Sequence, residues 1–297
     1  MAILDIQKIS KRFGEVDAVK ELGFSVSEGS VFGLLGPNGA GKTTTIRMIM
    51  QIIMPDAGQI FVFGQLNSMK QRDKIGYLPE ERGLYQKMKV LDTVLFFAEI
   101  KSVSQKQALE KANYWLERFE LCSWKDHKVQ DLSRGMQQKL QFICTIIHDP
   151  KLIILDEPFA GLDPVNTNLL KDIMLELKNS GSTIIFSTHL MDQVEKLCES
   201  IILINKGQDV LSGKLSEIKS QYTNNHIRMR YEGTAGFLRD RSLVAEFNDY
   251  GRYVELTPAD GRNPQEVLKA AMEQVFIESY ELTEPSLHDI FIDVVKK

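Results

Sequence analysis

The residues with the clearest chemical meaning in this sequence form the segment Gly36–Thr44 (GPNGAGKTT). The segment fits the pattern G-x-x-x-x-G-K-[ST], in which glycines let backbone amides turn toward a polyphosphate. In this pattern the lysine, here Lys42, reaches the terminal phosphates, and the hydroxyl of Thr43 holds a magnesium ion. The loop residues expected to contact the phosphate chain are Gly36, Pro37, Asn38, Gly39, Ala40, Gly41, Lys42, Thr43 and Thr44.

The segments on either side of this loop predict the elements that must hold it. The apolar run Ser30–Leu35 (SVFGLL) is typical of a buried strand, and Thr43–Met50 (TTTIRMIM) is typical of a helix. A helix that starts at the loop directs its N-terminal dipole toward bound phosphate. Strand, glycine loop and helix in this order are the context in which the pattern is specific.

A second chemical motif is the run Leu152–Pro158 (LIILDEP), a predicted buried strand that ends in adjacent carboxylates. Asp156 would join the magnesium shell from the side opposite the phosphate loop. Glu157 would polarise the attacking water as a general base. Taken alone, the run could be a strand followed by an acidic turn. The phosphate loop upstream favours the catalytic interpretation.

The pattern of apolar residues predicts a parallel sheet flanked by helices. The runs Lys151–Leu155 and Thr183–Ser187 suit strands buried on both faces, and a helix over Val165–Asn179 joins them into a βαβ unit. A helical pattern covers Val90 to about Glu120, and Ser133 can cap a helix that runs to about Ile147. Further expected strands are Ala2–Ile9, Gly23–Val26, Gln59–Phe63 and Ile75–Leu78.

The composition changes near Gln221–Asn225, and a different order of elements follows. This order, βαββαβα, predicts a small α+β domain of ferredoxin-like type. The expected strands are His226–Tyr231, Leu243–Phe247, Arg252–Thr257 and Val275–Leu282, and the expected helices are Thr234–Arg239, Asn263–Glu273 and Ser286–Val294.

The overall composition limits the classes of function. The chain has 297 residues, enough for about two domains, and its net charge of −4 provides no global basic field for nucleic acid. The three cysteines form no C-x-x-C pair, and the five histidines show no metal-ligand spacing. The N-terminus lacks the layout of a signal peptide, and no apolar stretch reaches the roughly 20 residues of a membrane span. We therefore expect any function at a membrane to depend on a partner.

The segment Leu132–Leu140 (LSRGMQQKL) resembles the signature loop of ATP-binding-cassette (ABC) proteins, usually written LSGGQ. Together with the two motifs above, it makes residues 1–218 resemble an ABC nucleotide-binding domain. This resemblance implies a P-loop NTPase fold of α/β class, with a RecA-like core, an antiparallel β subdomain and a helical subdomain at about residues 89–150. Residues 222–297, which end in EPSLHDIFIDVV, resemble the C-terminal extension of some bacterial exporter ATPases and form a separate accessory or regulatory domain in this interpretation.

The resemblance also implies roles for single residues. Phe13 occupies the position of an aromatic residue that stacks on adenine, and His189 that of a switch histidine that senses the terminal phosphate. In the family the signature loop caps the ATP of the partner subunit, and Asp163, in GLDP, contacts that subunit. Signature residues expected at the partner's nucleotide are Ser133, Gly135 and Met136.

Three positions depart from the family pattern. Arg134 replaces the first glycine of the signature loop, and Met136 replaces its glutamine. Glu80, in LPEERGLY, replaces a glutamine that ligates magnesium and relays contacts to the membrane subunit. A carboxylate can also ligate magnesium, and it adds negative charge near the phosphates. Some relatives that export drugs, sodium or lipids carry the same LPEERGLY pattern.

The resemblance implies an ATPase subunit of an ABC transporter of export type, which uses ATP and Mg²⁺. The expected partners are a second nucleotide-binding subunit, either a copy or a paralogue, and a separate transmembrane permease. The permease would hold this chain at the cytoplasmic face of the cell membrane. No nucleic-acid partner is expected. Two alternatives remain open: a soluble cassette ATPase that acts on ribosomes or DNA, and a tail that serves as a regulatory binding module.

Overall fold

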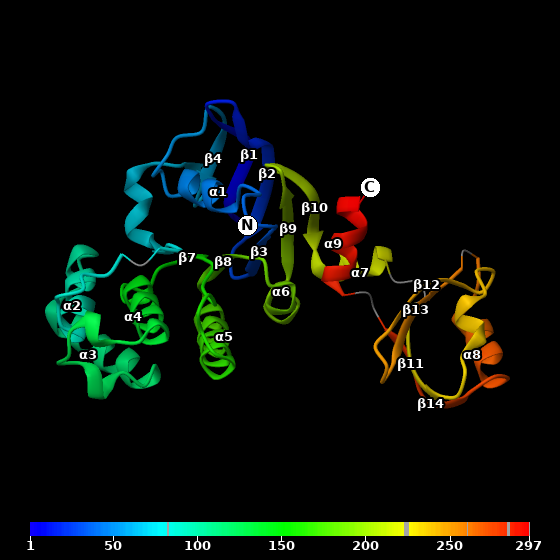
Figure 1. The fold of residues 1–297 in the computed structure, drawn as a ribbon. Helices are drawn as coiled ribbons and strands as arrows, with labels where there is room; N and C mark the ends of the chain where they lie inside the picture. The colour runs from blue at the N-terminus through cyan, green and yellow to red at the C-terminus, as the bar shows by residue number, and fades with distance from the viewer. Residues whose placement is uncertain (82, 223–225, 260, 284–285, 297) are drawn as a thin grey trace. The chain divides into compact units, whose positions relative to one another are not determined.

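The computed structural model describes residues 1–81, 83–222, 226–259, 261–283 and 286–296. Arg82 of the LPEERGLY pattern, residues 223–225 of the predicted linker, and Glu284 and Pro285 of the C-terminal motif therefore lie outside the described residues. The chain divides into two compact units, Met1–Leu215 and Ser216–Lys297. Figure 1 shows the elements of each unit, which we describe separately.

A six-stranded sheet forms the centre of the first unit, with strand order β10-β9-β3-β8-β7-β6. The strands from β6 to β9 in this order are parallel, and β10 is antiparallel to β9. The apolar side chains of the parallel strands are almost entirely buried, as expected for strands covered on both faces. Strands β9 and β10 were not expected from the sequence. The bounds are β3 Val31–Leu35, β6 Ile75–Leu78, β7 Leu152–Asp156, β8 Thr183–Thr188, β9 Ser200–Asn205 and β10 Gln208–Lys214.

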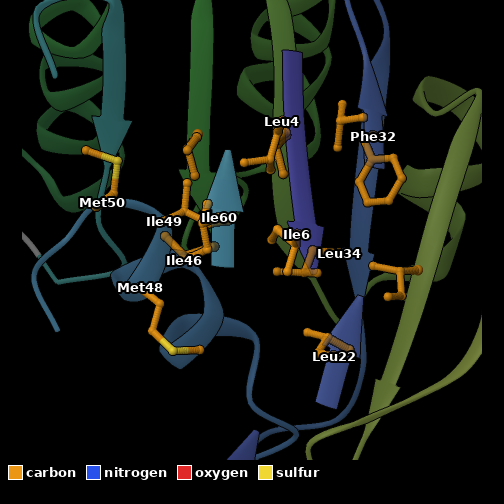
Figure 2. Close-up of a cluster of buried hydrophobic side chains, with 14 of the residues drawn as sticks. Leu4, Ile6, Leu22, Phe32, Leu34, Ile46, Met48, Ile49, Met50 and Ile60 are labelled. Atoms are coloured by element: carbon orange, nitrogen blue, oxygen red, sulfur yellow. The ribbon is translucent and has the colours of Figure 1, made fainter. Parts of the chain in front are cut away.

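A second, antiparallel sheet has the order β2-β1-β4-β5. Its strands are β1 Ala2–Phe13, β2 Val16–Ser27, β4 Ala57–Val62 and β5 Gln65–Leu66. The first two strands are longer than the sequence predicted, because register shifts at Ile6/Ile9 and Ile9/Lys11 interrupt the alternation of apolar and polar residues. Side chains of this sheet pack on the central sheet and on helix α1. Figure 2 shows Leu4, Leu22, Leu34 and Ile46 in this shared core.

Helices surround the central sheet of this unit. Helix α1 (Lys42–Ile49) follows the glycine loop, and α5 (Pro164–Asn179) and α6 (Met191–Leu197) follow later in the chain. Helix α7 (Leu215–Tyr222) begins at the last residue of this unit and otherwise belongs to the second. Three helices, α2 (Val90–Ile100), α3 (Gln105–Arg118) and α4 (Arg134–Ile146), pack against one another. The predicted helical stretch from Val90 to Glu120 is thus two helices, separated by a turn in which Ser102 has a φ of 59°.

The second unit contains a four-stranded antiparallel sheet of order β12-β13-β11-β14. The bounds are β11 His226–Glu232, β12 Val244–Asp249, β13 Val254–Pro258, β14 Phe276–Thr283, α8 Pro264–Met272 and α9 Leu287–Lys296. This order is that of the predicted ferredoxin-like type. One element differs: the predicted helix Thr234–Arg239 is a four-residue 3-10 helix, Gly236–Arg239, which anchors buried Phe237 and Leu238.

Candidate nucleotide-binding site

The loop between β3 and α1 contains two positions that only glycine can occupy. Gly36 has a φ of 149° and Gly41 a φ of 109°. A Cβ atom would lie 2.2 Å from the Ile204 carbonyl oxygen at Gly36, and 2.5 Å from the Ala18 carbonyl oxygen at Gly41. Side chains there would clash with rigid backbone, so these glycines are required by packing as well as by φ. The loop leads directly into the N-terminus of α1, where amides are free to bind an anion.

Lys42 folds back over this loop. Its side chain is only 6% exposed, and Nζ donates hydrogen bonds to the carbonyls of Gly36, at 2.7 Å, and Pro37, at 3.2 Å. Its Nζ also lies 3.7 Å from Oε1 of Glu157. The structure therefore brings the lysine of the first motif to the carboxylate of the second.

Asp156, at the end of β7, is fully buried and has one unsatisfied oxygen. Its Oδ1 accepts a hydrogen bond from the Ser187 hydroxyl, whereas Oδ2 has no partner among the described residues. A buried carboxylate oxygen without a partner is costly, and a cation is the usual compensation. Burial and the nearby Asp156 charge raise the pKa of Tyr77 to about 12. Carboxylate and hydroxyl oxygens are ligands that magnesium prefers, so Asp156 and Thr43 fit this ion.

Glu157 follows in a backbone conformation that is unfavourable for a side-chain-bearing residue, with a φ of 48°. Strand β8 holds it in place, because the Glu157 amide donates to the Ser187 carbonyl at 3.2 Å and to the Ser187 hydroxyl at 3.1 Å. Such a conformation persists only where the surroundings enforce it, as happens at functional sites. The carboxylate is thereby directed toward Lys42 and away from the strand.

His189 completes this group of side chains. It follows the end of β8, and its Nδ1 lies 3.1 Å from Oε1 of Glu157. When Nδ1 carries the ring proton, it donates a hydrogen bond to this carboxylate. The side chain is 52% exposed and can approach a bound molecule from one side of Glu157. Lys42 and His189 thus flank one carboxylate, from segments far apart in the sequence.

A cleft of about 680 Å³ opens above the glycine loop. Residues predicted from the sequence that line it are Asn38, Gly39, Ala40, Gly41, Lys42, Thr43, Thr44, Glu80 and Glu157. Residues that sequence reasoning missed are Glu15, Val16, Asp17, Ala18, Lys20 and Lys206. The first five of these lie in or beside the β1–β2 hairpin, and Lys206 lies in the β9–β10 turn.

Phe13 is not among the residues that line this cleft. It ends β1 with its ring half exposed, directly across the hairpin from Val16, which does line the cleft. The ammonium group of Lys11 lies 5.6 Å from the centre of the ring. The hairpin therefore holds Phe13 beside the cleft, and the apolar side chain of Val16 lines it.

The signature residues and Asp163 are not among the residues that line this cleft, and Ser133 and Asp163 act locally as helix caps. The Ser133 hydroxyl accepts from the Met136 amide at 3.3 Å at the start of α4, and Asp163 accepts from the Asn166 amide at 2.9 Å at the start of α5. The hydrogen bonds from Asn166 hold the pKa of Asp163 below its usual value. A Cβ atom at Gly135 would lie 3.7 Å from Leu162, which is ordinary contact. The chain's own packing therefore does not require glycine at this position.

Comparisons with known proteins agree with this geometry. The ABC transporter family model matches residues 19–160, and a model of the C-terminal domain of ATP-binding proteins like DrrA1-3 matches residues 213–295. The uncharacterized ABC transporter ATP-binding protein YhaQ of Bacillus subtilis is 43% identical over 99% of this chain and 98% of its own length. The linearmycin resistance ATP-binding protein LnrL of the same organism is 29% identical over 98% of both chains. A solved ATP-binding subunit of an ABC transporter covers 74% of this chain and 93% of its own, with a TM-score of 0.70 and 29% identity.

The fold and the site define a P-loop ATPase of the cassette type, with a RecA-like core, an antiparallel β subdomain and a helical subdomain. The chain belongs to the family of ABC transporter ATP-binding proteins. It is an ATP-binding subunit with ATPase activity, as the sequence predicted. Within the described ranges, none of the helices has the length and apolar character needed to cross a bilayer.

Proposed function

We propose that two such chains close head to tail around two ATP molecules and drive export through a separate membrane-spanning permease. The observation that carries this proposal is the division of the motifs within one chain. Lys42 and Glu157 line one cleft and His189 contacts Glu157, whereas Ser133 and Gly135 are not among the residues that line it. A second chain would supply the missing signature residues, as a copy of this chain or as a paralogue.

In this proposal the loop amides and Lys42 bind the β- and γ-phosphates, and Phe13 stacks on the adenine. Magnesium, held by Thr43, Asp156 and Glu80, would supply charge stabilisation for the leaving phosphates. Glu157 takes the proton of the attacking water, and His189 orients Glu157 and contacts the γ-phosphate. From the partner chain, Ser133, Gly135 and Met136 would cap the same nucleotide, and Asp163 would align the two subunits.

The proposal assigns residues 1–218 to the nucleotide-binding domain, with residues 89–150 as its helical subdomain, and residues 222–297 to an accessory domain. The separate core of the second unit, formed by residues such as Met229, Leu256 and Val267, supports this division. Similarity to the linearmycin resistance protein, along the full chain, supports the export direction. The permease would hold the chain at the cytoplasmic face of the membrane, where ATP is supplied.

A second cavity, of about 360 Å³, supports the permease partner. It lies between β6, α2 and α4, and its apolar lining includes Ile52, Leu84, Phe97 and Ile100. Ile52 and Ile100 remain more than half exposed, as expected for a surface that another protein covers. Gln141 of α4 donates to the carbonyls of Pro79 and Glu81 at 3.3 Å each, so the segment that carries Glu80 is tied to this groove. A permease helix docked here could therefore respond to events at the nucleotide.

Co-purification tests this proposal. We expect the tagged chain, captured from detergent-solubilised membranes with ATP, to bring down a multi-span membrane protein. The Ile52→Glu variant should retain less than about a tenth of this partner, because it buries a charge in an apolar contact. The matched control, Val210→Glu, changes an exposed valine of β10 that does not line the groove, and should retain the partner. Ribosomal proteins or DNA in place of a membrane protein would overturn the proposal in favour of a soluble cassette.

Glu80 gives a separate prediction about the metal shell. Its side chain lines the phosphate cleft and adds a negative charge there. Removal of that charge in Glu80→Gln should strengthen binding of metal-free ATP by about fivefold, which corresponds to about 1 kcal/mol. The concentration of Mg²⁺ needed for half-maximal activity should rise, because a charged ligand is lost. Titration of ATP with and without Mg²⁺ measures both effects. If Glu80→Gln behaves like the wild type in both titrations, Glu80 does not belong to the metal shell.

A further inference from the structure

Helix α4, which begins at the signature loop, is tied by a side chain to the turn that follows Glu157. Gln138 is 5% exposed, and its Nε2 donates to the carbonyl of Pro158 at 3.2 Å. Proline has no N–H, so this carbonyl is the backbone group through which residue 158 can be held by a hydrogen bond. Among the described residues, no backbone amide donates to it. Gln138 therefore supplies the hydrogen bond that the carbonyl beside Glu157 would otherwise lack.

The turn that receives this bond is closed by its own backbone hydrogen bonds and packs against the sheet. The Ala160 amide donates to the Glu157 carbonyl at 3.1 Å, and the Leu162 amide donates to the Phe159 carbonyl at 3.2 Å, so the turn is internally closed. The Phe159 ring packs edge-on against Phe186 of β8, with ring centres 5.7 Å apart. These contacts fix the turn to the sheet, and Gln138 fixes it to the helix.

The neighbours of Gln138 make similar bonds, but to other segments. Gln137 donates to the carbonyls of Val129 and Leu132 at 3.2 Å each. Lys139 donates to the Phe119 carbonyl at 3.2 Å. Of Gln137, Gln138 and Lys139, Gln138 is thus the residue that reaches the turn after Glu157, which we call the catalytic turn. Its loss should affect that turn specifically.

We infer that Gln138 is a positioning residue that couples the signature helix to the general base of the same chain. Because the Glu157 backbone is in an unfavourable conformation, its side-chain direction depends on how the following residue is held. The bond from Gln138 makes the start of α4 and the turn at Glu157 move together. Within the proposed two-chain assembly, contact of the signature residues with the partner's ATP would then set the position of Glu157 at this chain's own ATP.

The test compares three substitutions in the full-length protein. Gln138→Met keeps the volume and removes the donor. Its kcat should fall about tenfold or more with an unchanged KM and ATP affinity, since a misplacement of about 1 Å at a catalytic group can cost 10²-fold. Gln137→Met is the matched control, which loses two hydrogen bonds outside the catalytic turn, and its kcat should fall far less.

The third variant, Gln138→Glu, gives a pH readout, and its folded fraction is measured at each pH so that a change in stability is not mistaken for a change in kcat. The ionised carboxylate cannot donate to the Pro158 carbonyl, whereas the protonated carboxyl can. Burial should raise the pKa of this introduced group, so its activity relative to wild type should recover as the pH falls toward 6. The activity of Gln138→Glu is divided by the wild-type activity at the same pH, because the wild type has its own pH dependence.

Two results would overturn the inference. One is a Gln138→Met protein with wild-type kcat. The other is a Gln138→Met protein that loses kcat and ATP affinity together, while Gln138→Glu shows no recovery at low pH. A wild-type protein that hydrolyses ATP fully as a single chain would instead contradict the proposed two-chain site. Even then, a Gln138→Met protein that loses kcat and keeps its ATP affinity would support the inference that Gln138 positions Glu157.

Discussion

Replacement of Glu157 by glutamine should lower kcat for ATP hydrolysis by about 10²- to 10⁴-fold, the usual contribution of a general base. The amide is nearly the same size as the carboxylate, so its oxygen can still lie near the Lys42 ammonium group and accept a hydrogen bond from His189. It cannot take the proton of the attacking water. ATP should therefore bind with near wild-type affinity, remain intact and hold two chains together.

Single-turnover hydrolysis and equilibrium binding of ATP, measured on the same preparation, separate these effects. Glu110→Gln, which removes a carboxylate from the exposed face of α3, is the control for the loss of a charge. Turnover by Glu157→Gln within about threefold of wild type would show that another group acts as the base.

Replacement of Lys42 by alanine should primarily weaken the binding of ATP and only secondarily affect the hydrolysis step. The buried ammonium group is poised between two loop carbonyls and Glu157, so it is already desolvated and placed for an anion. Loss of a charged hydrogen-bond donor to phosphate should cost about 1.5–3 kcal/mol, which corresponds to about 10- to 150-fold weaker ATP binding. It also leaves Glu157 buried without its cation, which adds to the loss in stability.

Calorimetric titration with ATP and Mg²⁺ measures this change directly. Lys106→Ala, which removes an exposed lysine from α3, controls for the change in net charge and should bind as the wild type does. An affinity of Lys42→Ala equal to that of Lys106→Ala would mean that the lysine does not touch the phosphates. Glu157→Gln is thus expected to lose catalysis and keep ATP affinity, whereas Lys42→Ala is expected to lose ATP affinity.

The parts of the fold that the sequence predicted well are those set by local pattern. The continuous apolar runs at Ser30–Leu35 and Lys151–Leu155 lie in strands β3 and β7, because burial on both faces leaves no room for alternation. The βαβ order around α5 follows from the same runs. The long β1–β2 hairpin was underestimated, because its register shifts disturb the period of two. The turn at Ser102 was missed, since a single residue with positive φ leaves no mark in a helical pattern.

The candidate site, like the fold, has parts that the local sequence predicts and parts that it does not. The glycine loop and the adjacent carboxylates are continuous in sequence, so their types and spacing indicate them directly. The contacts of Ser187 with Asp156, of Lys206 with the cleft and of Gln138 with Pro158 join segments far apart in the chain. Neither spacing nor composition encodes such contacts, and they depend on the strand order β3-β8-β7 and on the approach of α4 to the sheet. Their residue types are ordinary at these positions, which is why no local signal could have identified them.

The claim at the centre of this account is that each ATP site is built from two chains. A mixture of two inactive variants tests it most directly. Lys42→Ala disables the phosphate loop, and Gly135→Asp places a negative charge in the signature loop at a position with room for a side chain. A mixed pair contains one undamaged site, so an equal mixture should regain about a quarter of wild-type ATPase activity. The control mixture, Lys42→Ala with Glu157→Gln, contains no undamaged site and should remain inactive. Recovery in the first mixture alone is the predicted result. If that mixture is as inactive as the control, copies of this chain do not share their ATP sites.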